Sequence, residues 1–379
     1  MKIYLDNAST SFYKPKCVKK IVKKGLKHYT ANSSRGGHLF SEQSGKIIAK
    51  TRELLANTFN CNFERVLFTS GCTESLNLAI LGTKKEKGHL IVSCFEHNSV
   101  LRVVEYLKRE CGIEYTVVYP KSKNGRIAID ELEQKIKCNT YGIIINHISN
   151  VTGVTQDIFQ IGKLAKKYKL LFIVDGAQSA GHEEIDMKKY NISLLALAGH
   201  KGLFGLQGVG ALCVNADVTL KPIKFGGTGT FSECLRQPED FPDGFESGTH
   251  SAINIASFGI GTSFAYNNLI SHKKKILKLT KFLTIKMLSN NLIKLYSLGN
   301  EQQGIVSFNV TGLSPQYIAS ELNKKGVAVR AGYCCAPLVQ KFLGTESCGG
   351  VVRVSIGCFN KMRDIKTFLK NLNSLILKR

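Results

Sequence analysis

The class of fold is indicated by residues 170–179, which read Leu170-Leu171-Phe172-Ile173-Val174-Asp175-Gly176-Ala177-Gln178-Ser179. The first five residues are all apolar, without the alternation of a strand that faces water on one side, so they predict a strand buried on both faces. Asp175 follows the strand directly, and the carboxyl end of a parallel strand is where α/β sheets bind their ligands. A helix N-cap is the alternative role for this aspartate.

Similar elements precede this stretch. Strands are expected at 65–68, 89–92, 113–119 and 142–146, and helices at 42–59, 75–81, from about 99, at 129–137 and at 158–168. Strands with little alternation that are separated by helices predict an α/β fold, with a mostly parallel sheet covered on both faces.

The pattern changes from about residue 257. A long lysine-rich helical stretch is expected to reach about 295, followed by strands at 304–310, 327–330 and 351–356 and helices at 315–325 and 361–377. A chain of 379 residues is long for one compact core. We therefore expect a large domain at 15–260 and a small α+β C-terminal domain at 261–379, joined by residues 1–14.

Composition narrows the class of protein. Apolar residues make up 43% of the chain and charged residues 21%, as in globular proteins. No apolar run approaches the roughly 20 residues of a membrane helix, and no signal peptide is recognised, so we expect a cytoplasmic protein away from membranes. The 12 cysteines then predict reduced thiols, and because none are spaced C-x-x-C we expect no metal site.

The chain is strongly basic, with 52 Lys and Arg residues against 28 Asp and Glu residues and a net charge of +24. The lysines are spread along expected helix faces, as at 19–24 and 273–275, and no nucleic-acid-binding motif is found. We therefore favour solvated helix surfaces over a nucleic-acid partner. RNA or an acidic protein is the alternative.

Two further segments suggest a site. In Ala198-Gly199-His200-Lys201-Gly202-Leu203-Phe204-Gly205, a lysine lies between small residues, where burial and nearby charge can keep its amine neutral for imine chemistry. Thr69-Ser70-Gly71-Cys72-Thr73-Glu74-Ser75 links an expected strand to a helix, and a helix N-terminus with hydroxyls can bind phosphate. A solvated lysine and a simple capping turn are the alternatives.

A last segment contains a candidate nucleophile. Cys335 lies in Arg330-Ala331-Gly332-Tyr333-Cys334-Cys335-Ala336-Pro337, and Arg353 lies on the strand that follows. A thiol near arginines can be an accessible thiolate, and an arginine can bind a carboxylate with two parallel hydrogen bonds. A buried thiol and a surface ion pair are the alternatives.

Together these segments resemble the class V aminotransferase superfamily of pyridoxal 5′-phosphate (PLP) enzymes, and within it the cysteine desulfurases. The resemblance runs nearly end to end. It includes Tyr4-Leu5-Asp6-Asn7-Ala8-Ser9-Thr10, Arg35-Gly36-Gly37-His38, Glu96-His97-Asn98, His147-Ile148-Ser149-Asn150-Val151-Thr152-Gly153 and Phe245-Glu246-Ser247-Gly248-Thr249. It implies the type I fold of PLP-dependent transferases and sulfur transfer from L-cysteine, which leaves L-alanine.

The resemblance also implies roles for single residues. Lys201, Cys335 and His97 would be catalytic: Lys201 carries PLP, Cys335 receives the sulfur, and His97 stacks on the ring. The implied cofactor-binding residues are Cys72, Thr73, His97, Asp175, Gln178, His200, Lys201 and Thr249, with Asp175 on the pyridine nitrogen and Gln178 on the phenolic oxygen. Thr249 would reach the partner's active site in a homodimer. The implied substrate-binding residues are His38, Asn150, Arg330 and Arg353.

Three features refine the resemblance. The segment between Cys335 and Arg353 is short, as in the group II desulfurases, which generally rely on a sulfur-acceptor protein. Ala198 replaces a serine that binds phosphate in many relatives. Cys334 stands where many group II relatives have histidine, and we hypothesise that it relays sulfur with Cys335; a neutral substitution is the alternative.

Other functions remain open. The same scaffold supports selenocysteine lyases and other class V lyases, epimerases and transaminases, although Cys335 favours desulfuration. A basic scaffold protein without catalysis is a further alternative, and the residues Lys201, Asp175, Gln178, His97 and Arg353 argue against it.

Overall fold

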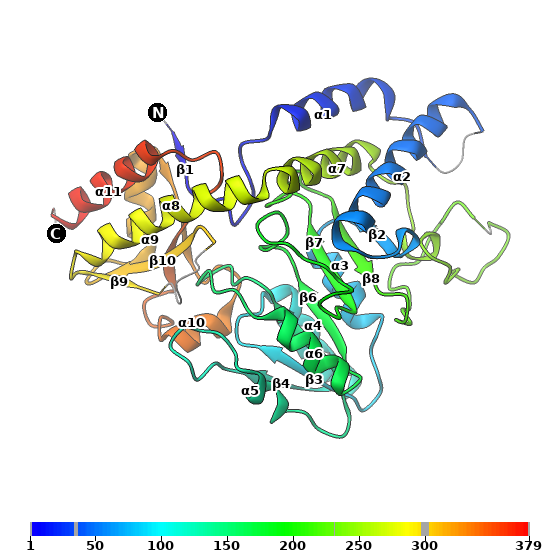
Figure 1. Ribbon diagram of the computed structural model, residues 1–379, viewed down its shortest axis with the longest axis horizontal. Coiled ribbons are helices and arrows are strands. Elements are labelled where there is room, and N and C mark those ends of the chain that lie inside the picture. Colours follow the sequence, from blue (N-terminus) through cyan, green and yellow to red (C-terminus); the bar gives the residue numbers. More distant parts are fainter. Residues whose placement is uncertain (1, 34–36, 231, 297–302, 378–379) are drawn as a thin grey trace.

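The computed structural model describes residues 2–33, 37–230, 232–296 and 303–377 (Figure 1). Its largest element is a seven-stranded sheet. In spatial order the strands are β2 (Val66–Thr69), β8 (Gly210–Val214), β7 (Leu194–Ala198), β6 (Leu171–Asp175), β5 (Thr140–Asn146), β3 (His89–Ser93) and β4 (Glu114–Val118). The run from β7 to β4 is parallel, and β8 is antiparallel to both of its neighbours. The predicted α/β fold with a mostly parallel sheet is confirmed.

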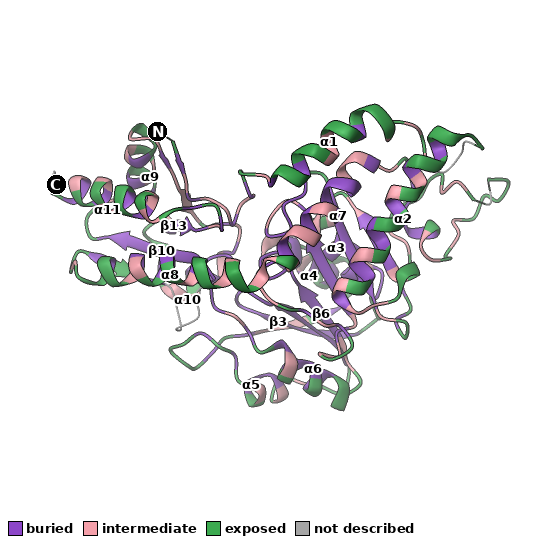
Figure 2. Cartoon of the chain, turned by 45° about the horizontal axis from the view of Figure 1, so that its top comes forward, coloured by how far each residue is buried: buried purple, intermediate pink, exposed green. Residues whose placement is uncertain are grey.

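Helices cover both faces of this sheet. Consecutive strand residues point to opposite sides, so a continuous apolar strand presents apolar side chains on both faces. On one face Ile143 and Ile145 pack in a cluster with helices α2 (Leu39–Phe59), α6 (Ile158–Lys167) and α7 (Ala252–Asn267). On the other face Ile144 packs with α3 (Cys72–Leu81) and α4 (Asn98–Cys111). Figure 2 shows the central strands buried between these layers; β5 is buried along its whole length, whereas the edge strand β4 is partly exposed.

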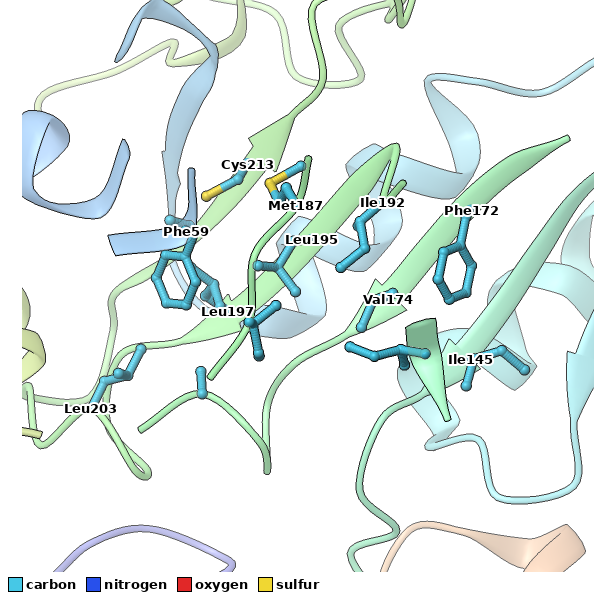
Figure 3. Close-up of a cluster of buried hydrophobic side chains, with 14 of the residues drawn as sticks. Phe59, Ile145, Phe172, Val174, Met187, Ile192, Leu195, Leu197, Leu203 and Cys213 are labelled. Carbon is cyan, nitrogen blue, oxygen red and sulfur yellow. The ribbon is translucent and has the colours of Figure 1, made fainter. Parts of the chain in front are cut away.

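Figure 3 shows part of the first face, where Phe172 and Val174 of β6 lie in one cluster with Leu195 and Leu197 of β7. Phe59 at the end of α2 packs into the same cluster. This continuous apolar layer positions the carboxyl ends of β5, β6 and β7, where Asn146, Asp175 and Ala198 are the last strand residues.

A second, smaller sheet has the order β12 (Arg330–Gly332), β13 (Val351–Ser355), β10 (Ile305–Val310) and β9 (Ile293–Leu295), all antiparallel. Its core also contains residues of α8 (Leu269–Leu288), α9 (Pro315–Lys324) and α11 (Met362–Ile376). Near the chain start, β1 (Ile3–Tyr4) pairs in parallel with β11 (Val327–Ala328), and Ile3 and Leu5 join this core. We propose that 261–379 with 1–14 form one domain and 15–260 the other, a division that this separate core supports.

The remaining elements are short or peripheral. They are α1 (Lys16–His28), which contacts α7, α5 (Ile129–Glu133), α10 (Pro337–Leu343), and the 3-10 turns η1 (Phe63–Arg65) and η2 (Asp243–Phe245). Within the described ranges, no helix is both long enough and apolar enough to cross a lipid bilayer.

Several expectations about elements were wrong. The long helix expected at 257–295 is α7 and α8, separated at Asn268, and β9 occupies its expected end. The strand expected at 327–330 is β11 and β12, which belong to different sheets. The helix expected at 129–137 ends at Glu133, and β1, β7, β8 and α10 were not expected. A run of apolar residues predicts a buried segment, but which sheet a strand joins depends on pairing with strands that are distant in the sequence.

A buried ion pair links α2 to the segment that contains Thr249. Arg52 donates two parallel hydrogen bonds to the Glu246 carboxylate, both at 2.8 Å. Glu246 also accepts from the backbone amide of Phe68 at 2.6 Å and pairs with His250 at 2.8 Å. Burial raises the pKa of Glu246, but the hydrogen bonds from Arg52 and His250 outweigh it and lower the pKa overall. The interaction therefore orients the loop before α7.

Replacing Arg52 with alanine is expected to lower the free energy of unfolding by about 3–5 kcal/mol, because Glu246 is left as a buried charge without its cation. Chemical denaturation of the two proteins measures the difference. The matched control is Lys46→Ala, which breaks an exposed ion pair with Glu42 on the same helix and should change stability by less than about 1 kcal/mol. Equal losses in the two variants would contradict a special role for the buried pair.

Candidate active site

A cavity of about 250 Å³ lies at the carboxyl ends of β5, β6 and β7. Eight of the residues expected at the site line it: Cys72, Thr73, His97, Asn150, Asp175, Gln178, His200 and Lys201. They come from separate loops that meet because the ends of neighbouring parallel strands share one edge of the sheet. The structure therefore brings these eight side chains to one cavity, and their expected roles there stay predictions.

Lys201 follows β7 and faces Asp175 across this cavity. Burial is the main reason why the pKa of Lys201 is lowered, and Arg353 and Arg330 lower it further, although Asp175 and Cys72 act in the opposite direction. A lowered pKa increases the fraction of neutral amine, which is the form that attacks a carbonyl group. The lowered pKa of Lys201 therefore favours imine formation.

Asp175 is buried and held by three donors. Its Oδ1 accepts from the backbone amide of Ala177 at 2.9 Å and from the Cys72 thiol at 3.5 Å, and its Oδ2 accepts from the Asn146 side-chain amide at 3.3 Å. These contacts orient the carboxylate at the cavity. Cys72 itself is a neutral thiol, because burial and the charge of Asp175 raise its pKa well above the ordinary value.

His97 and His200 are both neutral in this environment. Burial is the main reason why the pKa of His97 is lowered, and it lowers the pKa of His200 to about 4, with help from Lys201 and Lys14. His97 Nδ1 accepts a hydrogen bond from the Ser99 backbone amide at 3.1 Å and so caps helix α4. A fixed, neutral imidazole at the cavity wall suits stacking on a flat ring.

The N-terminus of α3 provides a site for an anion. Ser70, Gly71, Cys72 and Thr73 line the cavity where this helix begins, so its first backbone amides and the Thr73 hydroxyl are available for phosphate oxygens. Ala198 also lines the cavity, without the hydroxyl that many relatives have at this position.

Cys335 lies beside this cavity rather than in it. It lines a neighbouring cavity of about 600 Å³ that shares Thr73, His97 and Ser99 with the first. Arg330 Nη2 lies 3.5 Å from Cys335 Sγ, so a guanidinium faces the thiol directly. The cysteine is also partly exposed, as a sulfur acceptor requires.

The cysteine segment is fixed to the large domain by its backbone. The Asn150 side-chain amide donates to the Cys334 carbonyl at 2.7 Å, and the Asn98 amide donates to the Cys335 carbonyl at 2.8 Å. Both cysteines have positive φ, 52° and 59°, a backbone conformation that is uncommon for residues other than glycine. This tight turn directs the buried Cys334 side chain into the core and leaves Cys335 at the cavity.

Arg353 is fully buried, and its guanidinium has hydrogen-bond partners within the protein. Its guanidinium donates to the Asn150 carbonyl at 3.0 Å, to Asp6 at 2.7 Å and to Ser9 at 2.8 Å. Ser9 also accepts from Arg330 at 3.0 Å. Asp6 and Ser9 were not expected at the site, although both belong to the opening segment that carries the resemblance. The expected binding of a substrate carboxylate by Arg353 stays a prediction.

Two expected residues lie away from the cavity of this chain. His38 is exposed, accepts a hydrogen bond from the Ser41 amide as the N-cap of α2 and does not line this cavity, so its expected role at the substrate site stays a prediction. Arg35 and Gly36 of the same motif lie outside the described residues. Thr249 is exposed in an adjoining cavity that shares Ser70, Glu74 and Gly208 with the first.

Comparison with known proteins identifies the family. The family model for class-V aminotransferases matches residues 3–368. A probable cysteine desulfurase from Pyrococcus abyssi is 32% identical over 99% of this chain and 94% of its own length, and the cysteine desulfurase IscS of Shewanella piezotolerans is 30% identical over 99% and 93%. The structure of a cysteine desulfurase from Thermococcus onnurineus superimposes with a TM-score of 0.92 at 30% identity, covering 100% of this chain and 95% of that one. The chain therefore belongs to the class-V aminotransferase family, among its cysteine desulfurases.

Proposed function

We propose that the protein uses PLP, held by Lys201, to convert L-cysteine into L-alanine and to keep the sulfur as a persulfide on Cys335. The observation that carries this proposal is the arrangement of Lys201 and Asp175 in one cavity with Cys335 and Arg330 at its side. Family membership supports the same reaction.

The residues of the cavity fit PLP by their chemistry. The neutral amine of Lys201 matches the aldehyde, the Asp175 carboxylate matches the pyridine nitrogen, and the first turn of α3 matches the phosphate. His97 would lie on the ring. Gln178 donates to the Ala8 carbonyl at 2.8 Å, which leaves its other amide hydrogen for the cofactor. When bound, PLP accepts the electron pair released from the substrate Cα.

The protein side chains account for the remaining steps. Lys201 moves the proton from the substrate Cα, and Arg330 contacts the sulfur of Cys335 and orients it. Cys335 attacks the sulfur of the substrate, so that the Cβ–S bond breaks, an S–S bond forms and Cβ gains a proton. The reaction balances as cysteine plus thiol giving alanine plus persulfide, without an external oxidant.

The test is the release of alanine and sulfide from L-cysteine by the purified protein in the presence of a thiol reductant. Equal amounts of both products support the proposal. A protein that binds PLP but releases neither product would move the search to L-selenocysteine, as in a selenocysteine lyase, and to other amino acids. The same assay with added candidate acceptor proteins tests for a partner that takes up the persulfide for cluster assembly or thio-cofactors.

Two further parts of the proposal concern subunits and class. We propose a homodimer in which Thr249 reaches the partner's cavity, which is supported by its exposure and by its place in the adjoining cavity rather than in the one that contains Lys201. A monomeric mass in sedimentation equilibrium would contradict it. The short segment after Cys335 supports group II. A cytoplasmic location and the absence of a nucleic-acid partner stay predictions.

Replacing Cys334 with alanine is expected to change the rate of alanine formation by less than about twofold and to leave the persulfide yield unchanged. The Cys334 thiol is buried in the apolar core, and burial raises its pKa, so a thiolate at this position is disfavoured. The structure therefore favours a neutral substitution over sulfur relay. Mass spectrometry of the persulfide on Cys335 measures the yield, and a clear fall would restore the relay hypothesis.

A further inference from the structure

Asp175 belongs to a buried network of hydrogen-bonded polar groups. Asn146 ends β5 and is the register partner of Asp175 on β6, and its Nδ2 donates to Asp175 Oδ2 at 3.3 Å. Both side chains are 2% exposed. Because an ionised carboxylate only accepts hydrogen bonds, the nitrogen of the Asn146 amide must face Asp175, and its oxygen must face away.

Asn146 is in turn held by Glu96, the residue before His97. The Asn146 backbone amide donates to Glu96 Oε1 at 2.8 Å, and the Ser93 hydroxyl donates to the same oxygen at 2.5 Å. Glu96 is completely buried. Within the described part of the chain, no lysine, arginine or histidine forms an ion pair with it. A carboxylate buried without a cation is unfavourable.

Two buried oxygens of this group of polar side chains lack hydrogen-bond partners: Glu96 Oε2 and Asn146 Oδ1. Both are acceptors while Glu96 is ionised, so neither can satisfy the other. A proton on Glu96 Oε2 turns this atom into a donor, and a hydrogen bond from it to Asn146 Oδ1 would remove both deficits. Burial, with a smaller contribution from the charge of Asp175, outweighs the hydrogen bonds from Ser93 and Asn146 and raises the pKa of Glu96 to about 8. The acid is therefore mostly neutral at pH 7.

We propose that Glu96 is a positioning residue that, as a neutral acid, donates to the Asn146 side-chain carbonyl and so holds the Asn146 amide on Asp175. The proposal rests on the proposed function, in which Asp175 holds the ring nitrogen of PLP. Loss of the Glu96 proton places a second anion near Asp175 and frees the Asn146 amide to rotate. The titratable groups near Glu96 are Asp175 on β6 and, on its own loop, Cys94 and His97; Cys72 and Lys201 in turn interact with Asp175.

The test compares wild type with Glu96→Gln, whose side-chain amide donates a hydrogen bond at every pH and has nearly the same shape. The dissociation constant of PLP is measured by titration of the PLP-depleted full-length protein below and above pH 8. In wild type it should rise about tenfold as pH passes about 8. In Glu96→Gln it should stay within about twofold over the same range. Titration of Lys201 contributes equally to both proteins, so the difference between the curves isolates Glu96.

Two further measurements make the result decisive. The infrared band of a protonated carboxylic acid should be present in wild type below pH 8 and missing in Glu96→Gln. Asn146→Leu should weaken PLP binding at all pH values, because it removes the hydrogen bond to Asp175 directly. Parallel PLP titration curves for wild type and Glu96→Gln, or a carboxylic acid band that persists in Glu96→Gln, would overturn the proposal. Neither readout depends on which amino acid the enzyme uses, so failure of the desulfurase assay would leave this test intact.

Discussion

Replacing Lys201 with alanine is expected to reduce alanine formation from L-cysteine by at least about a thousandfold, because the same amine holds the cofactor and moves the Cα proton. No other lysine lines the cavity in the described part of the chain. Alanine release measures the rate. Borohydride reduction followed by peptide mass spectrometry measures covalent attachment of PLP, which should be found on Lys201 in wild type and be absent from the variant.

Lys14 provides the matched control for this prediction. Burial lowers its pKa to about 8, so it too is a partly neutral lysine. Its amine bonds the Gly205 carbonyl at 2.7 Å and the Ser11 hydroxyl at 2.9 Å instead of facing the cavity. Lys14→Met should therefore retain covalent PLP. Attachment of PLP at Lys14 in wild type, or a Lys201→Ala variant of normal rate, would contradict the assignment.

The second large effect is expected for Cys335→Ala, which should lower sulfide release at least about a thousandfold while PLP binding stays normal. The thiol lies 3.5 Å from Arg330 and lines the neighbouring cavity rather than the one that contains Lys201 and Asp175. Sulfide release with a thiol reductant and the absorbance of bound PLP measure the two properties separately. Cys348→Ala, which removes an exposed cysteine, is the control and should behave as wild type.

The outcome of this experiment separates two mechanisms. Loss of sulfide with PLP retained assigns the nucleophile to Cys335. Normal sulfide release from the variant would mean that sulfur leaves without a protein persulfide, and the chain would then be a simple cysteine lyase on the same scaffold.

Short sequence patterns predicted the central part of the site. A continuous apolar strand followed by Asp175, a glycine-flanked Lys201 and a phosphate-binding turn at residues 70–73 are short patterns whose chemistry depends on neighbours in the chain. Parallel strands place such ends together as a consequence of the α/β architecture. The cofactor site could therefore be predicted before the sheet order was known.

Other contacts join parts of the chain that no local pattern connects. Arg353 bonds Asp6 across 347 positions, and Arg330 bonds Ser9 across 321. Residues 327–332 divide between two sheets because Val327 pairs with Ile3 near the chain start, whereas Arg330 pairs with Arg353. Strand pairing is a choice among distant partners, and a run of apolar residues does not reveal that choice.

The sequence by itself predicted the α/β class, the family and the residues proposed to carry PLP chemistry, because these predictions depend on residue types in short segments. Only the tertiary structure decided that Asp6 and Ser9 of the N-terminal segment accept hydrogen bonds from Arg353 and Arg330. It also decided that Cys334 points into the core while Cys335 faces the cavity, and that hydrogen bonds link Glu96 through Asn146 to Asp175. The physical reason is that burial and hydrogen-bond partners, which set the charge of a carboxyl or thiol, are supplied by segments far apart in the chain.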